Sequence, residues 1–184
     1  MEEGLGSYPL ENLIEAILFV HPEPLPERRL QQAVSAILGR EVTAEEVQTA
    51  IGALQVRYAF TSLEVQAVAE GYAFRTRPEY GAAIAKFLGL QQPIRLSKAL
   101  LETLAVIAYH QPVTKAFVSH LRGTQSDYAV EKLLELELIE PAGRADLPGK
   151  PLMYRTTPKF LELVGLRSLA DLPRVEELGA GEGA

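Results

Sequence analysis

Apolar residues near the start of the chain recur at helical spacing in three successive segments. Residues 9–20, PLENLIEAILFV, place apolar side chains three and four positions apart, which predicts a helix that the proline-rich HPEPLP ends. The same spacing predicts a second helix over residues 27–38. Thr43, followed three positions later by Glu46, forms a capping box and predicts a third helix that runs to about Tyr58.

A period of two replaces the helical period over residues 63–77, LEVQAVAEGYAFRTR. Such alternation around Glu70-Gly71 indicates two strands of a β-hairpin. Pro78 then opens a further helix with the sequence EYGAAIAKFLG. Three helices followed by a hairpin predict a winged-helix domain.

The same order of elements recurs after the linker LQQPIRL, which indicates an internal repeat. A helix that begins near Leu100 ends at Pro112, as the first helix of the chain ends before Pro24. Residues 115–121 predict a short second helix, which Gly123 breaks.

The remainder of the repeat supplies a third helix and a second wing. Ser126 is placed to cap a helix over residues 127–137. Residues 138–141 and 151–156 predict strands on either side of the loop AGRADLPGK, and a last short helix follows over residues 158–163. After Pro173 the composition falls to Glu, Gly and Ala, which cannot bury apolar surface.

The sequence therefore predicts a mainly α (α+β) fold of two tandem winged-helix domains, each with three helices and a β-hairpin wing. The expected boundaries are a flexible N-terminus (1–8), an N-terminal winged-helix domain (9–90), a linker (91–96), a C-terminal winged-helix domain (97–172) and a disordered tail (173–184).

Composition excludes much chemistry. The 184 residues contain no cysteine, so no disulfide, thiolate zinc site or thiol nucleophile is available. The three histidines form no HExxH pattern, and no phosphate-binding GxxxxGK[ST] occurs. No apolar run of about 18 residues and no basic, apolar signal segment is present. We expect a cytoplasmic protein with no membrane contact, no catalytic residues, no metal and no cofactor.

The charge distribution disfavours DNA as the main partner. The formal net charge is −6, although residues 91–172 carry 10 basic against 9 acidic side chains. On the predicted third helix of the second domain, Asp127, Glu131 and Glu135 recur every four residues and form an acidic stripe. Lys132 is the only basic residue of this helix. This stripe is either a solvated helix face or a surface for a basic partner segment, and it would repel phosphates.

The second wing leaves more alternatives open. Arg144, Lys150 and Arg155 cluster around its Gly-Pro-rich loop. Three interpretations are open: these charges keep a sheet edge soluble, they dock a protein, or they contact DNA. The competing hypothesis is a dimeric winged-helix transcription regulator that binds an operator through these residues together with Arg75 and Arg77.

Nearly the whole chain, from Leu10 to Pro173, resembles the segregation and condensation protein B family. The similar stretches are LIEAILFV, EPLP, LSKALLETLAVIAYHQPVTK, LRGTQSD, LLELELIEPAGRADLPGKPLMYRTT and FLELVGLRSLADLP. The resemblance implies a nucleoid-associated homodimer that binds the kleisin ScpA and, through ScpA, the SMC ATPase heads. It also implies that the first domain dimerises, that both domains hold the kleisin, and that DNA contact is weak or indirect.

Motif positions carry over individually. Matching residues are Arg122, Gly123, Ser126 and Asp127 in the turn and Gly143, Arg144, Asp146, Pro148, Gly149, Pro151 and Tyr154 in the wing. Thr124, Lys150 and Arg155 depart from the residues usual in the family, and Lys150 lacks the planar fork of an arginine. Ser126 is equally consistent with a helix cap and Tyr154 with packing.

The candidate sites combine these motif positions with apolar side chains. Candidate partner-binding residues are Phe117, Arg122, Asp127, Tyr128, Glu131, Arg144, Asp146, Leu147, Pro148, Gly149, Lys150, Met153 and Tyr154. Candidate dimerisation residues lie on the first helix, which is apolar on more than one side, and at a glycine of the third helix: Leu13, Ile14, Ile17, Phe19 and Gly52. The glycine is expected to allow close approach of another backbone.

Overall fold

The computed structural model describes residues 8–89 and 96–174. The flexible N-terminus, the linker and the disordered tail expected from the sequence lie almost entirely outside the described residues. The chain divides into two compact units, residues 1–91 and 92–184.

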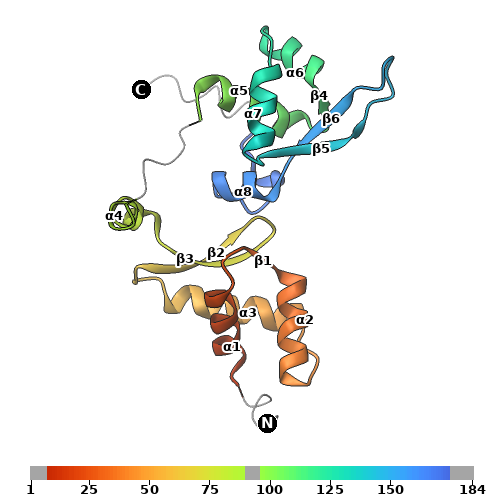
Figure 1. Ribbon diagram of the computed structural model, residues 1–184. Helices are drawn as coiled ribbons and strands as arrows, with labels where there is room; N and C mark the ends of the chain where they lie inside the picture. The colour runs from red at the N-terminus through yellow and green to blue at the C-terminus, as the bar shows by residue number, and fades with distance from the viewer. Residues whose placement is uncertain (1–7, 90–95, 175–184) are drawn as a thin grey trace. The chain divides into compact units, whose positions relative to one another are not determined.

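The first unit begins with three helices and continues into a hairpin (Figure 1). Its elements are α1 (Leu10–Val20), β1 (Leu25–Pro26), α2 (Glu27–Leu38), α3 (Ala44–Arg57), β2 (Leu63–Val68), β3 (Gly71–Thr76), the 3₁₀ helix η2 (Pro78–Tyr80) and α4 (Gly81–Phe87). The predicted capping box is confirmed, because the Thr43 hydroxyl accepts from the Glu46 N–H and the Glu46 carboxylate accepts from the Thr43 N–H.

The core of the first unit lies between the three helices and a sheet of order β1-β3-β2. Each helix contributes the apolar face that its spacing predicts. The buried core side chains are Ile14, Leu18, Leu25, Leu30, Val34, Leu38, Val42, Val47, Ala50, Ile51, Leu54, Val65 and Tyr72. Burial of these apolar side chains is the main favourable contribution to folding of the unit.

The hairpin turn lies one residue earlier than the sequence predicts. Val68 pairs with Gly71, so that Ala69 and Glu70 form the two-residue turn at φ of 48° and 60°. Gly71 is instead a strand residue, and a Cβ there would lie 2.6 Å from the carbonyl carbon and oxygen of Leu25. The glycine is required for close approach of β1 to β3, and not for the turn itself.

The second unit repeats this order of elements. It contains α5 (Lys98–His110), β4 (Val113–Thr114), α6 (Lys115–Arg122), α7 (Asp127–Glu135), β5 (Ile139–Arg144), β6 (Leu152–Thr156), α8 (Pro158–Val164) and the 3₁₀ helix η3 (Leu169–Asp171). Its sheet has the order β4-β6-β5, and the β5–β6 hairpin extends beyond the helices (Figure 1). The mixed α+β class predicted from the sequence is confirmed.

Two local predictions in the second unit are wrong. The third helix ends at Glu135 and not at Glu137, because Glu137 adopts a positive φ of 59° that stops the helix. Ser126 occupies the position before this helix but its side chain does not cap it. Its hydroxyl donates to the carbonyl of Thr124 and accepts from Arg122.

None of the described helices is long and apolar enough to cross a lipid bilayer.

Candidate partner-binding surfaces

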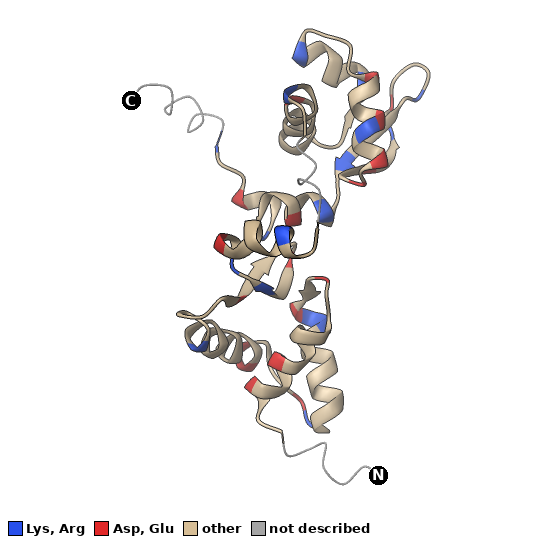
Figure 2. Cartoon of the chain, turned by 60° about the vertical axis from the view of Figure 1, so that its left-hand side comes forward, with Lys and Arg blue, Asp and Glu red and all other residues tan. Residues whose placement is uncertain are grey.

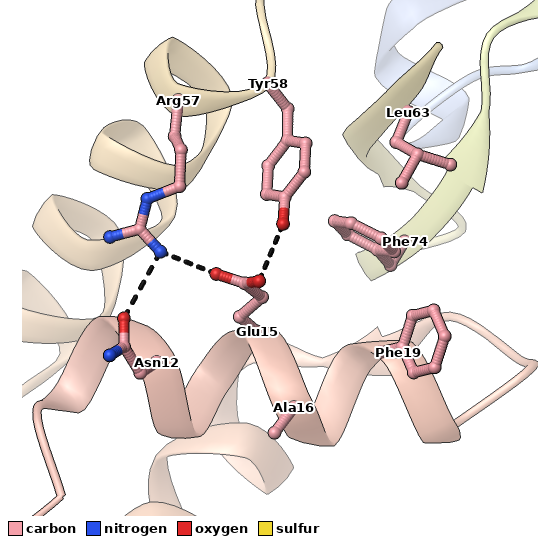
Figure 3. A pocket seen from close by; sticks show the side chains of 8 residues that line it. All are labelled: Asn12, Glu15, Ala16, Phe19, Arg57, Tyr58, Leu63 and Phe74. Atoms are coloured by element: carbon pink, nitrogen blue, oxygen red, sulfur yellow. Dashed lines mark hydrogen bonds and ion pairs between the residues drawn. The ribbon is translucent and has the colours of Figure 1, made fainter. Parts of the chain in front are cut away.

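The first unit has an aromatic groove, a hollow of about 640 Å³ on its surface (Figure 3). It is lined by residues of α1, of the end of α3 and of the hairpin: Asn12, Glu15, Ala16, Phe19, Arg57, Tyr58, Leu63 and Phe74. The Phe74 ring meets those of Tyr58 and Phe19 edge to face, with centroids 4.9 and 6.0 Å apart. Such contacts fix the aromatic wall of the groove.

The polar groups of the aromatic groove satisfy one another. Glu15 accepts hydrogen bonds from Arg57 Nη1 and from the Tyr58 hydroxyl, each at 2.6 Å (Figure 3). The hydrogen bond to Glu15, together with burial, raises the pKa of Tyr58. Arg57 also binds Glu11 and Asn12. The unpaired part of this surface is therefore apolar.

The residues predicted for dimerisation differ in their exposure. Phe19 is 70% exposed and lines the aromatic groove. Ile14 is 0% exposed and belongs to the core of its own unit, so the prediction that it contacts a second copy is wrong. Leu13 and Ile17 are half-buried against the same core. Gly52 is partly exposed, and a Cβ there would meet nothing within 4 Å.

Exposed apolar residues that the sequence analysis did not select lie at the ends of α1 and α3. Val20, Val56 and Phe60 are strongly exposed, and Phe60 is fully so. Phe60 lies between Tyr58 and Leu63 in the chain, both of which line the aromatic groove. Its place after the helix gave no periodic signal in the sequence.

The second unit has a wing groove of about 570 Å³. Its walls come from the start of α6, the start of α7 and the two strands of the wing: Lys115, Ala116, Ser119, Asp127, Arg144, Pro151, Leu152 and Tyr154. Three of the predicted partner-binding residues, Asp127, Arg144 and Tyr154, therefore meet in one hollow.

Lys115 and Lys132 pair with the three carboxylates of the predicted acidic stripe. The Lys115 Nζ lies 3.1 Å from Glu131 and 3.6 Å from Asp127, while Lys132 lies 2.6 Å from Glu135. Burial lowers the pKa of Lys115, but the hydrogen bond to Glu131 and the neighbouring negative charges outweigh burial and raise the pKa overall. Each carboxylate of the stripe therefore has a lysine partner, while Asp127, Glu131 and Glu135 all stay more than 60% exposed.

Lysine at the first position of a helix is a signal that the sequence analysis missed. A cation there opposes the positive end of the helix dipole and needs compensating carboxylates nearby. The pairing of Lys115 with Asp127 and Glu131 supplies them.

The side chains of Tyr154 and Arg122 are largely buried. Tyr154 is 5% exposed, although it lines the wing groove. The Arg122 side chain is 8% exposed and is bound to Glu102 at 3.0 Å and to the Ser126 hydroxyl at 3.2 Å. Its guanidinium links α5 to the α6–α7 turn, so that little of the Arg122 side chain is accessible to a partner.

The remaining predicted partner-binding residues are more accessible. Phe117 packs beside His110 yet stays exposed, and Met153 is half-buried on β6. Other exposed residues lie on α7 and along the wing loop: Tyr128, Glu131, Asp146, Leu147, Pro148, Gly149 and Lys150. Arg144 Nη1 donates to the Lys150 carbonyl at 2.9 Å, which holds the base of this loop.

The arginines required by a DNA-binding regulator are largely engaged within the chain. Arg77 donates to three backbone carbonyls, those of Tyr58, Ala59 and Thr61. Arg155 pairs with Glu140 at 2.8 Å. Acidic and basic residues are interspersed along the ribbons of both units (Figure 2).

No group of three or more His, Asp or Glu side chains within residues 8–89 and 96–174 is arranged to hold a metal ion.

Residues 12–175 match the family described as segregation and condensation complex subunit ScpB. The chain belongs to this family. It is 42% identical to segregation and condensation protein B of Syntrophotalea carbinolica over 91% of this chain and 83% of that protein. It is 41% identical to the Carboxydothermus hydrogenoformans protein of the same name over 89% of this chain and 86% of that protein.

Two solved structures are also similar. The crystal structure of ScpB from Mycobacterium tuberculosis is 30% identical, covers 85% of this chain and 95% of its own, and has a TM-score of 0.39. A conserved hypothetical protein from Chlorobium tepidum is 40% identical, with 85% and 96% coverage and a TM-score of 0.38. The sequence matches establish a segregation and condensation subunit of the ScpB family.

Proposed function

We propose that this chain is a non-catalytic adaptor of the condensin-like SMC complex. It binds the kleisin ScpA and, through ScpA, reaches the SMC ATPase heads, to support chromosome condensation and segregation during cell division. It acts in the cytoplasm, at the nucleoid. Membership of the ScpB family supports the role in segregation, and the wing groove is the observation that carries the binding role.

The wing groove has the chemistry of a binding surface. Pro151 and Leu152 form an apolar wall. Beside it, Lys115 is held by its ion pair with Asp127, and Arg144 is held by its hydrogen bond to the Lys150 carbonyl. Preorganised groups lose little entropy when a partner binds, which favours recognition.

Co-purification from the native cell tests the adaptor role. Tagged full-length chain is expected to recover ScpA and the SMC ATPase together. Leu152→Asp, in the groove wall, is expected to reduce recovery of ScpA because it places a carboxylate against the apolar side chains of the partner. Leu163→Asp, on exposed α8, is the matched control. Absence of ScpA from the wild-type eluate would contradict the proposal.

We further propose that the chain is a homodimer joined through the aromatic groove of the first unit. Phe19 and Phe60 leave an apolar surface exposed beside a hollow, which favours contact with a second copy. Light scattering at micromolar concentration is expected to give a dimer mass for the wild type and a lower mass for Phe19→Ser. Phe87→Ser, on exposed α4, is expected to remain a dimer. A monomer mass for the wild type would contradict the proposed homodimer.

DNA contact through this subunit is, in our proposal, weak or indirect. A regulator making six or more phosphate contacts would lose about 10³-fold in DNA affinity between 50 and 200 mM salt. The adaptor is expected to bind a duplex weakly at both concentrations, as fluorescence anisotropy can measure.

A further inference from the structure

The tyrosine of the wing groove has an unused hydroxyl. Tyr154 is 5% exposed and lines the hollow; none of the hydrogen bonds among the described residues involves its hydroxyl, which is not one of the buried atoms left without a partner. The ring is buried while the hydroxyl oxygen opens to the groove, where it can hydrogen-bond to water or to a group of a partner. An acceptor or donor from outside the chain would complete this site.

Three other side chains of the wing groove have N–H or O–H groups free to donate. Lys115 has three N–H groups, of which one donates to Glu131, while Asp127 lies 3.6 Å away as an ion-pair partner. Arg144 has five, of which one is directed to the Lys150 carbonyl. Ser119 accepts from the Ser126 N–H and keeps its own hydrogen to donate. The amino end of the eight-residue α6, where Lys115 and Ala116 lie, adds the positive end of a helix dipole.

The wing groove therefore presents donors next to an apolar wall. The apolar lining consists of Ala116, Pro151 and Leu152, with exposed Phe117 following in α6. The carboxylate of Asp127, the acidic group in the lining, is already paired with Lys115. A complementary ligand brings an anionic acceptor and an apolar group together.

We propose that the wing groove seats an acidic side chain of the partner segment, an aspartate or glutamate next to an apolar residue, with Arg144 and the Tyr154 hydroxyl donating to its carboxylate. This inference rests on the proposed function, since it specifies which chemical group of ScpA the wing groove binds. A nucleic-acid phosphate offers the same acceptor chemistry, but Asp127, Glu131 and Asp146 around the groove disfavour a polyanion.

Binding of intact ScpA to the full-length chain, measured by calorimetry, tests the proposal. Tyr154→Phe is expected to weaken binding about threefold or more and Arg144→Gln about tenfold or more, as expected for a neutral and a charge-assisted hydrogen bond. Arg155→Gln, the neighbouring position on β6 whose side chain pairs with Glu140, is the matched control and is expected to bind as the wild type does.

Two further measurements distinguish a role in binding the carboxylate from a role in stabilising the fold. Tyr154→Phe is expected to leave thermal stability of the free chain unchanged, because the hydroxyl makes no hydrogen bond within the described residues; a loss of stability would indicate a structural hydroxyl and contradict the proposal. Neutralising one acidic residue of ScpA by Asp→Asn or Glu→Gln is expected to reduce affinity for the wild type and not for Arg144→Gln.

The outcomes distinguish the two proposals. If the wild type does not bind ScpA, the proposed function fails and the inference with it. If ScpA binds equally well to the wild type, Tyr154→Phe and Arg144→Gln, the proposed function stands and the inference is overturned. Binding of a DNA duplex at 150 mM salt that is lost in both variants would overturn it in favour of a phosphate ligand.

Discussion

Gly71 is a described glycine of the first unit at which an added Cβ would clash with backbone atoms. It pairs with Val68 in the hairpin and with Pro26 in β1, and the Leu25 carbonyl occupies the space that a Cβ would need. Gly52 is the opposite case, because a Cβ there would meet nothing within 4 Å.

Gly71→Ala is expected to lower the free energy of unfolding by about 1–3 kcal/mol, because β1 must move away from β3 to accommodate the methyl group. Gly52→Ala, within α3, is expected to raise it by up to about 1 kcal/mol through helix propensity. Urea unfolding of both variants measures the difference. Equal effects of the two alanines would contradict the close approach, and loss of the dimer in Gly52→Ala would restore a role for Gly52 at a second backbone.

Arg122 is a buried cation whose charge is balanced across elements. Its Nη2 binds Glu102 of α5, its Nη1 binds Ser126, and its Nε has no partner among the described residues. A guanidinium in this setting is costly to leave unpaired. Arg122 matches a motif position of the family, but its partner Glu102 lies 20 residues away and could not be predicted from spacing.

Glu102→Gln is expected to destabilise the chain by about 1–3 kcal/mol, because the buried Arg122 loses its counter-charge. The matched control is Glu135→Gln, since Glu135 pairs with Lys132 on an exposed face and such pairs contribute about 0–1 kcal/mol. Thermal or urea unfolding of the two variants provides the comparison. A cost no larger for Glu102 than for Glu135 would mean that solvent stabilises Arg122.

At the scale of elements, the start of α3 depends on protonation. The Thr43 N–H that donates to Glu46, together with Arg40 beside it, lowers the pKa of the Glu46 carboxyl below its ordinary value of 4.5. A carboxyl with a lowered folded-state pKa stabilises the fold above its unfolded pKa. That contribution is lost as the pH falls through the folded-state pKa.

Glu46→Gln is therefore expected to be less stable than the wild type at pH 7, and the difference is expected to shrink as the pH falls below about 4.5. Glu45→Gln removes a charge from the same turn without removing the capping bond, and serves as the control. Urea unfolding at several pH values tests this. A difference between wild type and Glu46→Gln that does not change with pH would show that the charge of the cap is unimportant.

Helices and hairpins were predictable from local signals, whereas the shortest strands were not. The capping box at Thr43 and the period of two in β2 and β3 each carry their structure within a few residues. β1 and β4 have two residues each, too few to show a period, and their strand character comes only from pairing with β3 and β6. For both β1 and β4, a proline was the only local signal in the sequence.

At the scale of the whole molecule, the candidate surfaces were only partly predictable. Phe19, Asp127 and Arg144 were selected from apolar spacing and motif positions, and they line the two grooves. Lys115 was not, because its partners lie 12 and 16 residues further along the chain and meet it only after α6 and α7 pack. Ile14 was wrongly selected, since a helix apolar on several sides can bury all of them within its own unit.

The two units contain separate sets of core residues, so mutational effects are expected to stay within a unit. Gly71 belongs to the first unit, whereas Leu104 is buried in α5 of the second. Mutations at distant sites with no shared partners usually have additive effects. Leu104→Ala is expected to cost about 2–5 kcal/mol, as a cavity in a packed core does.

Hydrogen exchange followed by mass spectrometry can locate each effect. Gly71→Ala is expected to speed exchange in α1, α2, α3 and the first hairpin while leaving α5 to α8 protected, and Leu104→Ala is expected to do the reverse. Because the wing groove lies wholly in the second unit, Gly71→Ala should also keep the affinity for ScpA that the second unit contributes. Loss of protection in both units from either substitution would mean that they unfold as one cooperative body, and binding could then not be assigned to one unit by such variants.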